Sequence, residues 1–303
     1  MRKNLLKLFI LVLPAVIIYF LFRDIYRNWN EIKSYAVNIN YAWLFVSYAG
    51  FIVANIFMTG IWYVLLRKMR APIGLGASIA IWSVSILGKY IPGKGWQFVS
   101  IVYIARKLGV SYTKSVTASV MGQILAIIAG LIAGFSILKP YLPPVVMAVF
   151  LAGSLIFIYP DFLNRLLKIL GKITGKDIVE IDLGMRDTLT VTFLYLLGWL
   201  VFGLSFNILI MSIFPDWGFK VFYSTKIFVS SYLMGLFAVF VPGGLGVREG
   251  VMAFLLGKSL PAYLASFISV LARLVATISE LTLTVYGIYF LKKSGFEVFR
   301  KSE

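Results

Sequence analysis

The segments Ile91-Pro-Gly-Lys-Gly95 and Val241-Pro-Gly-Gly-Leu-Gly246 each interrupt a long apolar stretch of this chain. The apolar halves beside them are too short to cross a bilayer, which takes about 20 residues. Proline removes a backbone donor and glycine loosens the chain, and such breaks survive at membrane depth only inside protein or beside a water-filled cavity. We therefore predict that residues 75–108 and 225–257 form two helical hairpins that re-enter the membrane.

We call residues 91–95 the first elbow and residues 241–246 the second elbow. Their turns depend on prolines and glycines, and the residues expected to matter are Pro92, Gly93, Gly95, Pro242, Gly243, Gly244 and Gly246.

The composition indicates a membrane protein. Hydrophobic residues make up 60% of the 303 residues and charged residues 14%, against roughly 45–50% and about 25% in globular proteins. The chain has no Cys and no His, which excludes thiol nucleophiles, histidine acid–base catalysis and the usual zinc sites. We expect no metal and no cofactor.

Six further segments are long enough to be full transmembrane helices, which predicts an all-α, polytopic helix bundle with the two hairpins added. No small-residue cleavage site follows the first segment, so we interpret it as an uncleaved helix. The six segments are residues 1–22, 41–66, 115–138, 141–159, 188–214 and 261–291.

The distribution of Lys and Arg predicts the orientation in the membrane. The net charge is +17, and most of the 29 Lys and Arg residues fall on the side of the N-terminus if both hairpins return to the face they enter. Cytoplasmic loops carry such an excess. We expect a multi-pass protein of the cell (cytoplasmic) membrane with both termini in the cytoplasm. Contact with anionic lipid explains the surplus more simply than nucleic acid does.

The two elbows resemble copies of one unit. A shift of 150 residues places Pro92 on Pro242, Gly93 on Gly243 and Gln123 on Arg273. We predict one integral membrane domain over residues 1–303, with repeat halves at about 41–160 and 188–291 and a cytoplasmic amphipathic connector at 161–187. Three crossings separate the hairpins, so the halves form an inverted repeat, as in many secondary transporters.

Ionisable groups at membrane depth are costly and are functional candidates. Arg273 and Glu280 are seven residues apart and lie on one polar face of the last apolar segment. These groups either lock the bundle together as ion pairs or line a path for a charged headgroup, and both roles can coexist. In a third interpretation, Arg248 or Glu280 lies at the membrane interface and reaches water with its charged end. The candidate path residues are Lys89, Lys94, Gln97, Gln123, Arg248, Glu249, Arg273 and Glu280.

The segments Gly88-Lys-Tyr-Ile-Pro-Gly-Lys-Gly-Trp96 and Val241-Pro-Gly-Gly-Leu-Gly-Val-Arg-Glu-Gly250 resemble the signature segments of the lysylphosphatidylglycerol synthase transmembrane region family. This flippase-like domain also occurs in archaeal dolichol-linked glycosylation proteins. The resemblance implies a protein that handles lipids, and Arg248 and Glu249 match the charged pair that follows the glycine elbow. The sequence carries no aminoacyl-transferase domain, so we do not expect this chain to lysylate lipid.

These observations predict a lipid translocase that moves a phospholipid or a lipid-linked headgroup. Its partners would be membrane lipids with anionic or lipid-linked headgroups, together with a partner glycosyltransferase or synthase. Two alternatives stay open. The first is a membrane subunit or transferase in polyprenyl-linked glycan or lipid modification, and the second is a small-solute or ion transporter. The sequence does not fix the oligomeric state.

Overall fold

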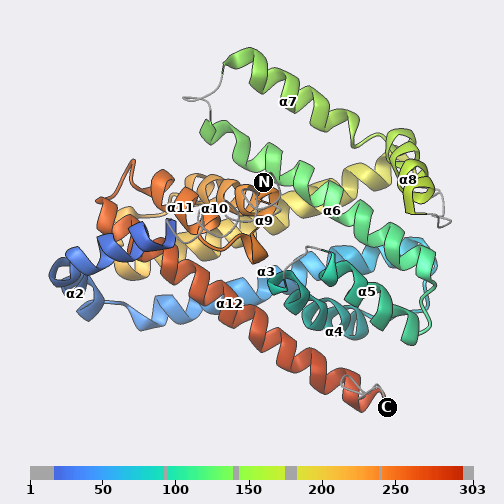
Figure 1. Ribbon diagram of the computed structural model, residues 1–303, viewed down its shortest axis with the longest axis horizontal. Coiled ribbons are helices and arrows are strands. Elements are labelled where there is room, and N and C mark those ends of the chain that lie inside the picture. The colour runs from blue at the N-terminus through green and yellow to red at the C-terminus, as the bar shows by residue number, and fades with distance from the viewer. Residues whose placement is uncertain (1–16, 92–94, 139–142, 175–182, 239–240, 296–303) are drawn as a thin grey trace, which may run out of the picture.

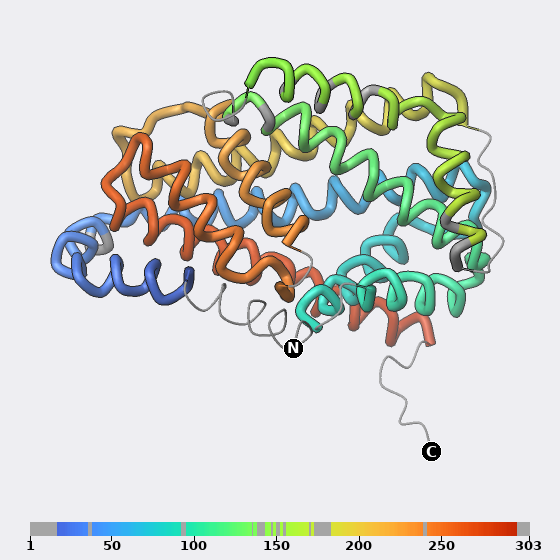
Figure 2. The backbone as a smooth tube through the Cα atoms, turned by 45° about the horizontal axis from the view of Figure 1, so that its top comes forward, coloured from blue at the N-terminus to red at the C-terminus, as the bar shows by residue number. Residues whose placement is uncertain are grey.

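The computed structural model describes residues 17–91, 95–138, 143–174, 183–238 and 241–295. Throughout these residues the secondary structure is helical, as predicted (Figures 1 and 2). Pro92, Gly93 and Lys94 lie outside the described residues, so the predictions on these three residues are not tested. Most of the predicted first crossing also lies outside them, and residues 17–27 at its end are helical.

Among the described residues, four helices are long and apolar enough to cross a membrane, which makes the protein a multi-pass membrane protein. Helix α9 packs against α3 and α6, and α12 packs against α3 (Figure 1). The predicted segments locate all four helices to within a few residues. The four are α3 (Tyr41–Lys68), α6 (Tyr112–Gly134), α9 (Met185–Ile213) and α12 (Ala262–Lys293).

The second predicted hairpin is broken at its proline and glycines, and the helices described on either side of the first elbow end and begin next to it. In the first, α4 (Leu75–Ser85) passes into the 3-10 helix η1 (Ile86–Tyr90), and α5 (Trp96–Lys107) follows the elbow. In the second, α10 (Val221–Phe237) is followed by η4 (Pro242–Gly244) and α11 (Val247–Leu256). Helix α12 packs against α4 of one hairpin and α11 of the other, so it connects the two (Figure 1).

The remaining helices lie around this framework. Helix α7 has 13 residues and runs beside α6, so it is shorter than the predicted crossing at 141–159 (Figure 2). The number of six full crossings therefore stays a prediction. The elements of this group are α2 (Trp29–Val37), η2 (Phe135–Leu138), α7 (Pro144–Ile156), α8 (Pro160–Thr174) and η3 (Pro215–Trp217).

Helix α8 falls within the segment predicted as a connector, and it is amphipathic. Its apolar side chains Leu163 and Leu167 are buried in the protein core, while Arg165 and Lys172 are exposed. The apolar face is therefore covered by the protein itself.

Small residues allow the long helices to approach closely, as is common in membrane proteins. A Cβ on Gly134 would lie 2.9 Å from the hydroxyl of Ser230, and one on Gly130 would lie 3.2 Å from the ring nitrogen of Trp199. The contact is tightest at Gly203, where a Cβ would overlap Thr225 of α10. Gly203 therefore sets the distance between α9 and α10.

We expect Gly203→Ala to destabilise the protein by about 1–3 kcal/mol, the usual cost of overpacking a close contact. Gly60→Ala in α3 is the matched control, because a Cβ there meets nothing within 4 Å. Thermal unfolding in detergent should show a lower midpoint for Gly203→Ala alone. Equal midpoints for the two variants would contradict the close approach of α9 and α10.

Candidate functional site

A cavity of about 300 Å³ lies where η1 of the first hairpin approaches η4 of the second. Rings from α9 and α10 form much of its wall, among them Trp199, Phe202, Phe228 and Tyr232. The predicted residues that line it are Lys89, Gln97, Gln123, Gly243, Gly244, Arg248, Arg273 and Glu280. The structure therefore gathers six of the eight candidate path residues around one space.

The second elbow depends on glycine. Gly243, Gly244 and Gly246 have φ angles of 59°, 67° and 79°, a region that side chains with a Cβ rarely adopt. Gly244 also lies against Gly235 of α10, where a Cβ would be only 2.8 Å from the Gly235 Cα. Two glycines in contact thus close this hairpin, and the chain then turns directly into α11.

In the first hairpin, η1 and α5 approach each other closely at Gly88, just before the elbow. A Cβ on Gly88 would lie 2.6 Å from the backbone nitrogen of Gln97, so a side chain at position 88 would push α5 away from η1. Gly95 has an ordinary φ of −76° and open space where a Cβ would be, so its backbone does not require glycine. Gly88 belongs to the quoted signature segment but was not among the predicted site residues.

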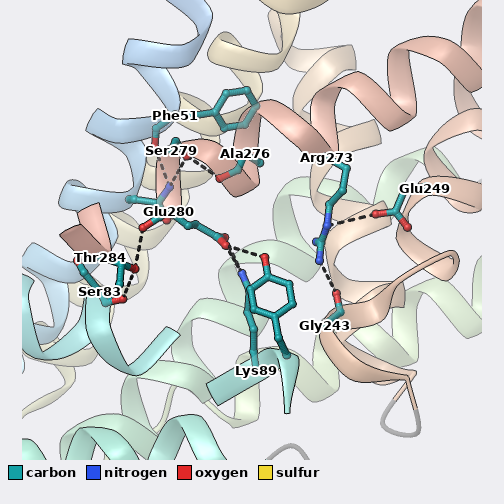
Figure 3. Close-up of polar contacts among 12 residues, drawn as sticks. Phe51, Ser83, Lys89, Gly243, Glu249, Arg273, Ala276, Ser279, Glu280 and Thr284 are labelled. Atoms are coloured by element: carbon teal, nitrogen blue, oxygen red, sulfur yellow. Dashed lines mark hydrogen bonds and ion pairs between the residues drawn. The ribbon is translucent and has the colours of Figure 1, made fainter. Parts of the chain in front are cut away.

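Lys89 and Glu280 form an ion pair across 191 residues of sequence. The Nζ of Lys89 lies 2.6 Å from each carboxylate oxygen of Glu280 (Figure 3). The hydroxyl of Tyr90 also donates to Oε2 of Glu280 at 3.1 Å. These side chains are largely buried, with exposed fractions of 20% for Lys89 and 12% for Glu280. The carboxylate thus receives three contacts from the first hairpin.

Arg273 connects α12 to the second hairpin. Its Nη2 donates to the carbonyl of Gly243 at 3.1 Å, and its Nε lies 3.4 Å from Oε1 of Glu249 (Figure 3). The backbone N–H of Gly246 donates to the other oxygen of Glu249 at 2.6 Å. Glu249 therefore caps α11 and balances Arg273, and it is not among the residues lining the cavity.

Tyr90, the last residue of η1, joins the first hairpin to the second elbow. The Arg273 guanidinium lies 5.9 Å from the centre of the Tyr90 ring, and a Cβ on Gly243 would be 3.3 Å from that ring. Tyr90 therefore contacts the second elbow with its ring and Glu280 with its hydroxyl. Sequence reasoning missed it, although it is adjacent to Lys89 in the signature segment.

Arg248 is oriented differently from the other charges. It is buried, with 6% exposed, and its guanidinium lies over the rings of Phe228 at 4.8 Å and Tyr232 at 5.1 Å. Contacts of this kind stabilise a cation through the ring quadrupole. The two rings are four residues apart on α10, so they share one face, but nothing in the sequence pairs them with Arg248.

The polar face of α12 points inward, as its spacing predicted. Ser266, Ser269 and Thr284 are buried, and Arg273 and Glu280 line the cavity. Thr284 donates to the carbonyl of Ser83 at 2.7 Å, which ties this face to α4 (Figure 3).

A comparison with protein families gives one match. The sequence model described as "Lysylphosphatidylglycerol synthase TM region" matches residues 4–283, which is most of the chain. This match confirms the resemblance seen in the two signature segments. No curated protein and no solved structure matches the chain.

The Lys89–Glu280 pair can be tested by a double-mutant cycle. Lys89→Met and Glu280→Gln should each lower the free energy of unfolding by up to about 3–5 kcal/mol, because each leaves a buried charge without its partner. The double variant should recover much of the loss. Lys293→Met at the exposed end of α12 is the control. Additive losses, measured by unfolding in detergent, would show that the two residues do not interact.

Proposed function

The chain belongs to the lysylphosphatidylglycerol synthase TM region family, and from this premise we propose that it translocates a lipid with a polar headgroup. The cavity between the elbows holds the headgroup while the acyl or prenyl chains stay in the bilayer. Membership makes the chain a membrane protein of a lipid-handling family, and the translocation step is our proposal.

The observation that carries this proposal is the gathering of charges around a single cavity inside an apolar helix bundle. Lys89, Arg248, Arg273 and Glu280 all line this cavity. Each charge at membrane depth costs a few kcal/mol, about 2.5–3.5 on insertion scales. Two ion pairs would suffice to hold helices together, but they would not require an open space between them. An open space with charged groups on its wall, inside the bundle, is what a headgroup needs to cross the bilayer.

The proposed mechanism is alternating access around the two elbows. Arg273 holds the second elbow through the Gly243 carbonyl, and Glu280 holds the first through Lys89 and Tyr90. Both residues lie on α12, seven positions apart, so a small shift of either hairpin along α12 would break one set of contacts before the other. Breaking one set would open the cavity toward one membrane face.

The overall architecture that we propose for this cycle follows the sequence predictions. Two re-entrant hairpins belong to inverted repeat halves at about 41–160 and 188–291, within about six full crossings. The protein lies in the cell membrane with both termini in the cytoplasm. Opposite entry of the hairpins would give each membrane face its own elbow, which is the arrangement of many secondary transporters.

The test is leaflet exposure of fluorescent lipids in proteoliposomes that contain the purified protein. The wild type should speed exchange between leaflets. Glu249→Gln should slow it by about tenfold or more, the effect of roughly 1.4 kcal/mol on a barrier. The physical reason is that Arg273 loses the carboxylate that balances it beside the second elbow.

Asp216→Asn is the matched control, because it removes one carboxylate from the exposed η3 turn, outside the cavity. This variant should keep the wild-type rate. Absence of exchange with every lipid, by protein that unfolds cooperatively on heating, would overturn the proposal. That outcome would favour a subunit of a partner glycosyltransferase or synthase.

A further inference from the structure

Both carboxylates near the cavity are already balanced within the protein. Glu280 receives Lys89 on both oxygens and the hydroxyl of Tyr90. Glu249 receives the N–H of Gly246 and faces Arg273 at 3.4 Å. A cationic headgroup entering the cavity would therefore find no carboxylate available unless it first displaced a lysine or an arginine.

Arg248 differs from Lys89 and Arg273, because no described carboxylate forms an ion pair with it. Within the described part of the chain its guanidinium has no hydrogen bond or ion pair, only the faces of Phe228 and Tyr232. The sequence supports this, because no Asp or Glu occurs from residue 32 to 160 or from 217 to 248. No acid on either elbow can therefore neutralise Arg248, and Glu249 next to it is turned toward Gly246 and Arg273.

The charges around the site thus leave one positive charge uncompensated. Among the charged residues that the structure describes there, Lys89, Arg248 and Arg273 are opposed by Glu249 and Glu280 only. A buried charge without a partner is strongly unfavourable, and an anion in the cavity would remove that penalty. The planar guanidinium presents a fork of donors that matches two oxygens of a phosphate.

Two amide side chains extend the same site. Gln97 and Gln123 both line the cavity, and neither side-chain amide makes a hydrogen bond to any other residue that the structure describes. Amides can donate to and accept from hydroxyl groups, but they carry no charge to balance an ammonium group. Together with Arg248 they suit a phosphate joined to an uncharged, hydroxyl-bearing group.

We propose that the cavity selects a singly anionic headgroup, in which Arg248 binds the phosphate and Gln97 and Gln123 bind an attached polyol such as glycerol or a sugar. This proposal rests on the proposed function and names its substrate class. Lys89 is then a partner of Glu280 and does not bind phosphate. Headgroups that carry an amine are disfavoured, because the site offers them no free carboxylate.

The experiment measures binding to the purified full-length protein in a neutral detergent. Dihexanoyl phosphatidylglycerol, dihexanoyl phosphatidylcholine, glycerol phosphate and inorganic phosphate are titrated separately. Tryptophan fluorescence reports binding, since Trp82 and Trp199 line the cavity. We expect phosphatidylglycerol to bind at least about tenfold more tightly than phosphatidylcholine. Glycerol phosphate and inorganic phosphate, which lack acyl chains, should bind more weakly than phosphatidylglycerol.

Arg248→Gln should abolish the preference for phosphatidylglycerol, and Arg248→Lys should keep part of it because the charge remains. Arg186→Gln, an exposed residue in the first turn of α9, is the matched control and should bind as wild type does. Without lipid, Arg248→Gln should unfold at the wild-type temperature or above it, because it removes an unpaired buried charge. A lower unfolding temperature would show that Arg248 has a structural role instead.

Several results would overturn the proposal. One is equal binding of the two lipids, and another is an unchanged preference in Arg248→Gln. Inorganic phosphate binding as tightly as phosphatidylglycerol would identify a free-anion site and reject a lipid headgroup. Exchange in proteoliposomes at equal rates for both lipids would reject the selectivity but keep translocation. Selective binding without any exchange would keep the anion site and reject translocation.

Discussion

The contacts of Arg273 are the ones on which the arrangement of this protein depends. A broken helix leaves a backbone carbonyl without its helical partner, and in the second elbow such a carbonyl belongs to Gly243. Arg273 donates to it, pairs with Glu249 and lies against the ring of Tyr90. One side chain on α12 therefore stabilises the break in one hairpin and joins it to the other. Without a cation at this position, no charged side chain would connect the second elbow to Tyr90.

The second set of contacts on α12 complements the first. Glu280 lies on the same face of α12 as Arg273, about two turns further along, and contacts Lys89 and Tyr90 of the first hairpin. The two hairpins are thus held by charges of opposite sign on one helix, and each charge is balanced where it binds. This leaves the cavity with Arg248 as its unopposed cation among the described residues, which gives the space a chemical preference as well as a shape.

Close helix packing elsewhere offsets the free-energy cost of burying these charged groups. Gly203 places α9 directly against α10, and α10 carries the rings of Phe228 and Tyr232 beneath Arg248. Dispersion contacts and small residues hold membrane helices together because lipid provides no hydrophobic drive between them. The glycine contacts of α9 therefore position the aromatic wall of the cavity.

The helical class, the long apolar helices, the break in the second hairpin and the family can all be predicted from the amino-acid sequence. These features are local, because apolar length, proline, glycine and a recurring polar face on α12 follow from neighbouring residues. The sequence also identified most of the charges that line the cavity. The pairing of the charges could be seen in the three-dimensional structure alone, since Lys89 and Glu280 are 191 residues apart. The structure alone revealed the contacts of Tyr90, the role of Gly88, and the position of Arg248 over two rings of α10. A buried charge pairs with the oppositely charged group that helix packing places next to it. Because that packing consists of contacts between distant segments, local sequence patterns do not reveal the partner.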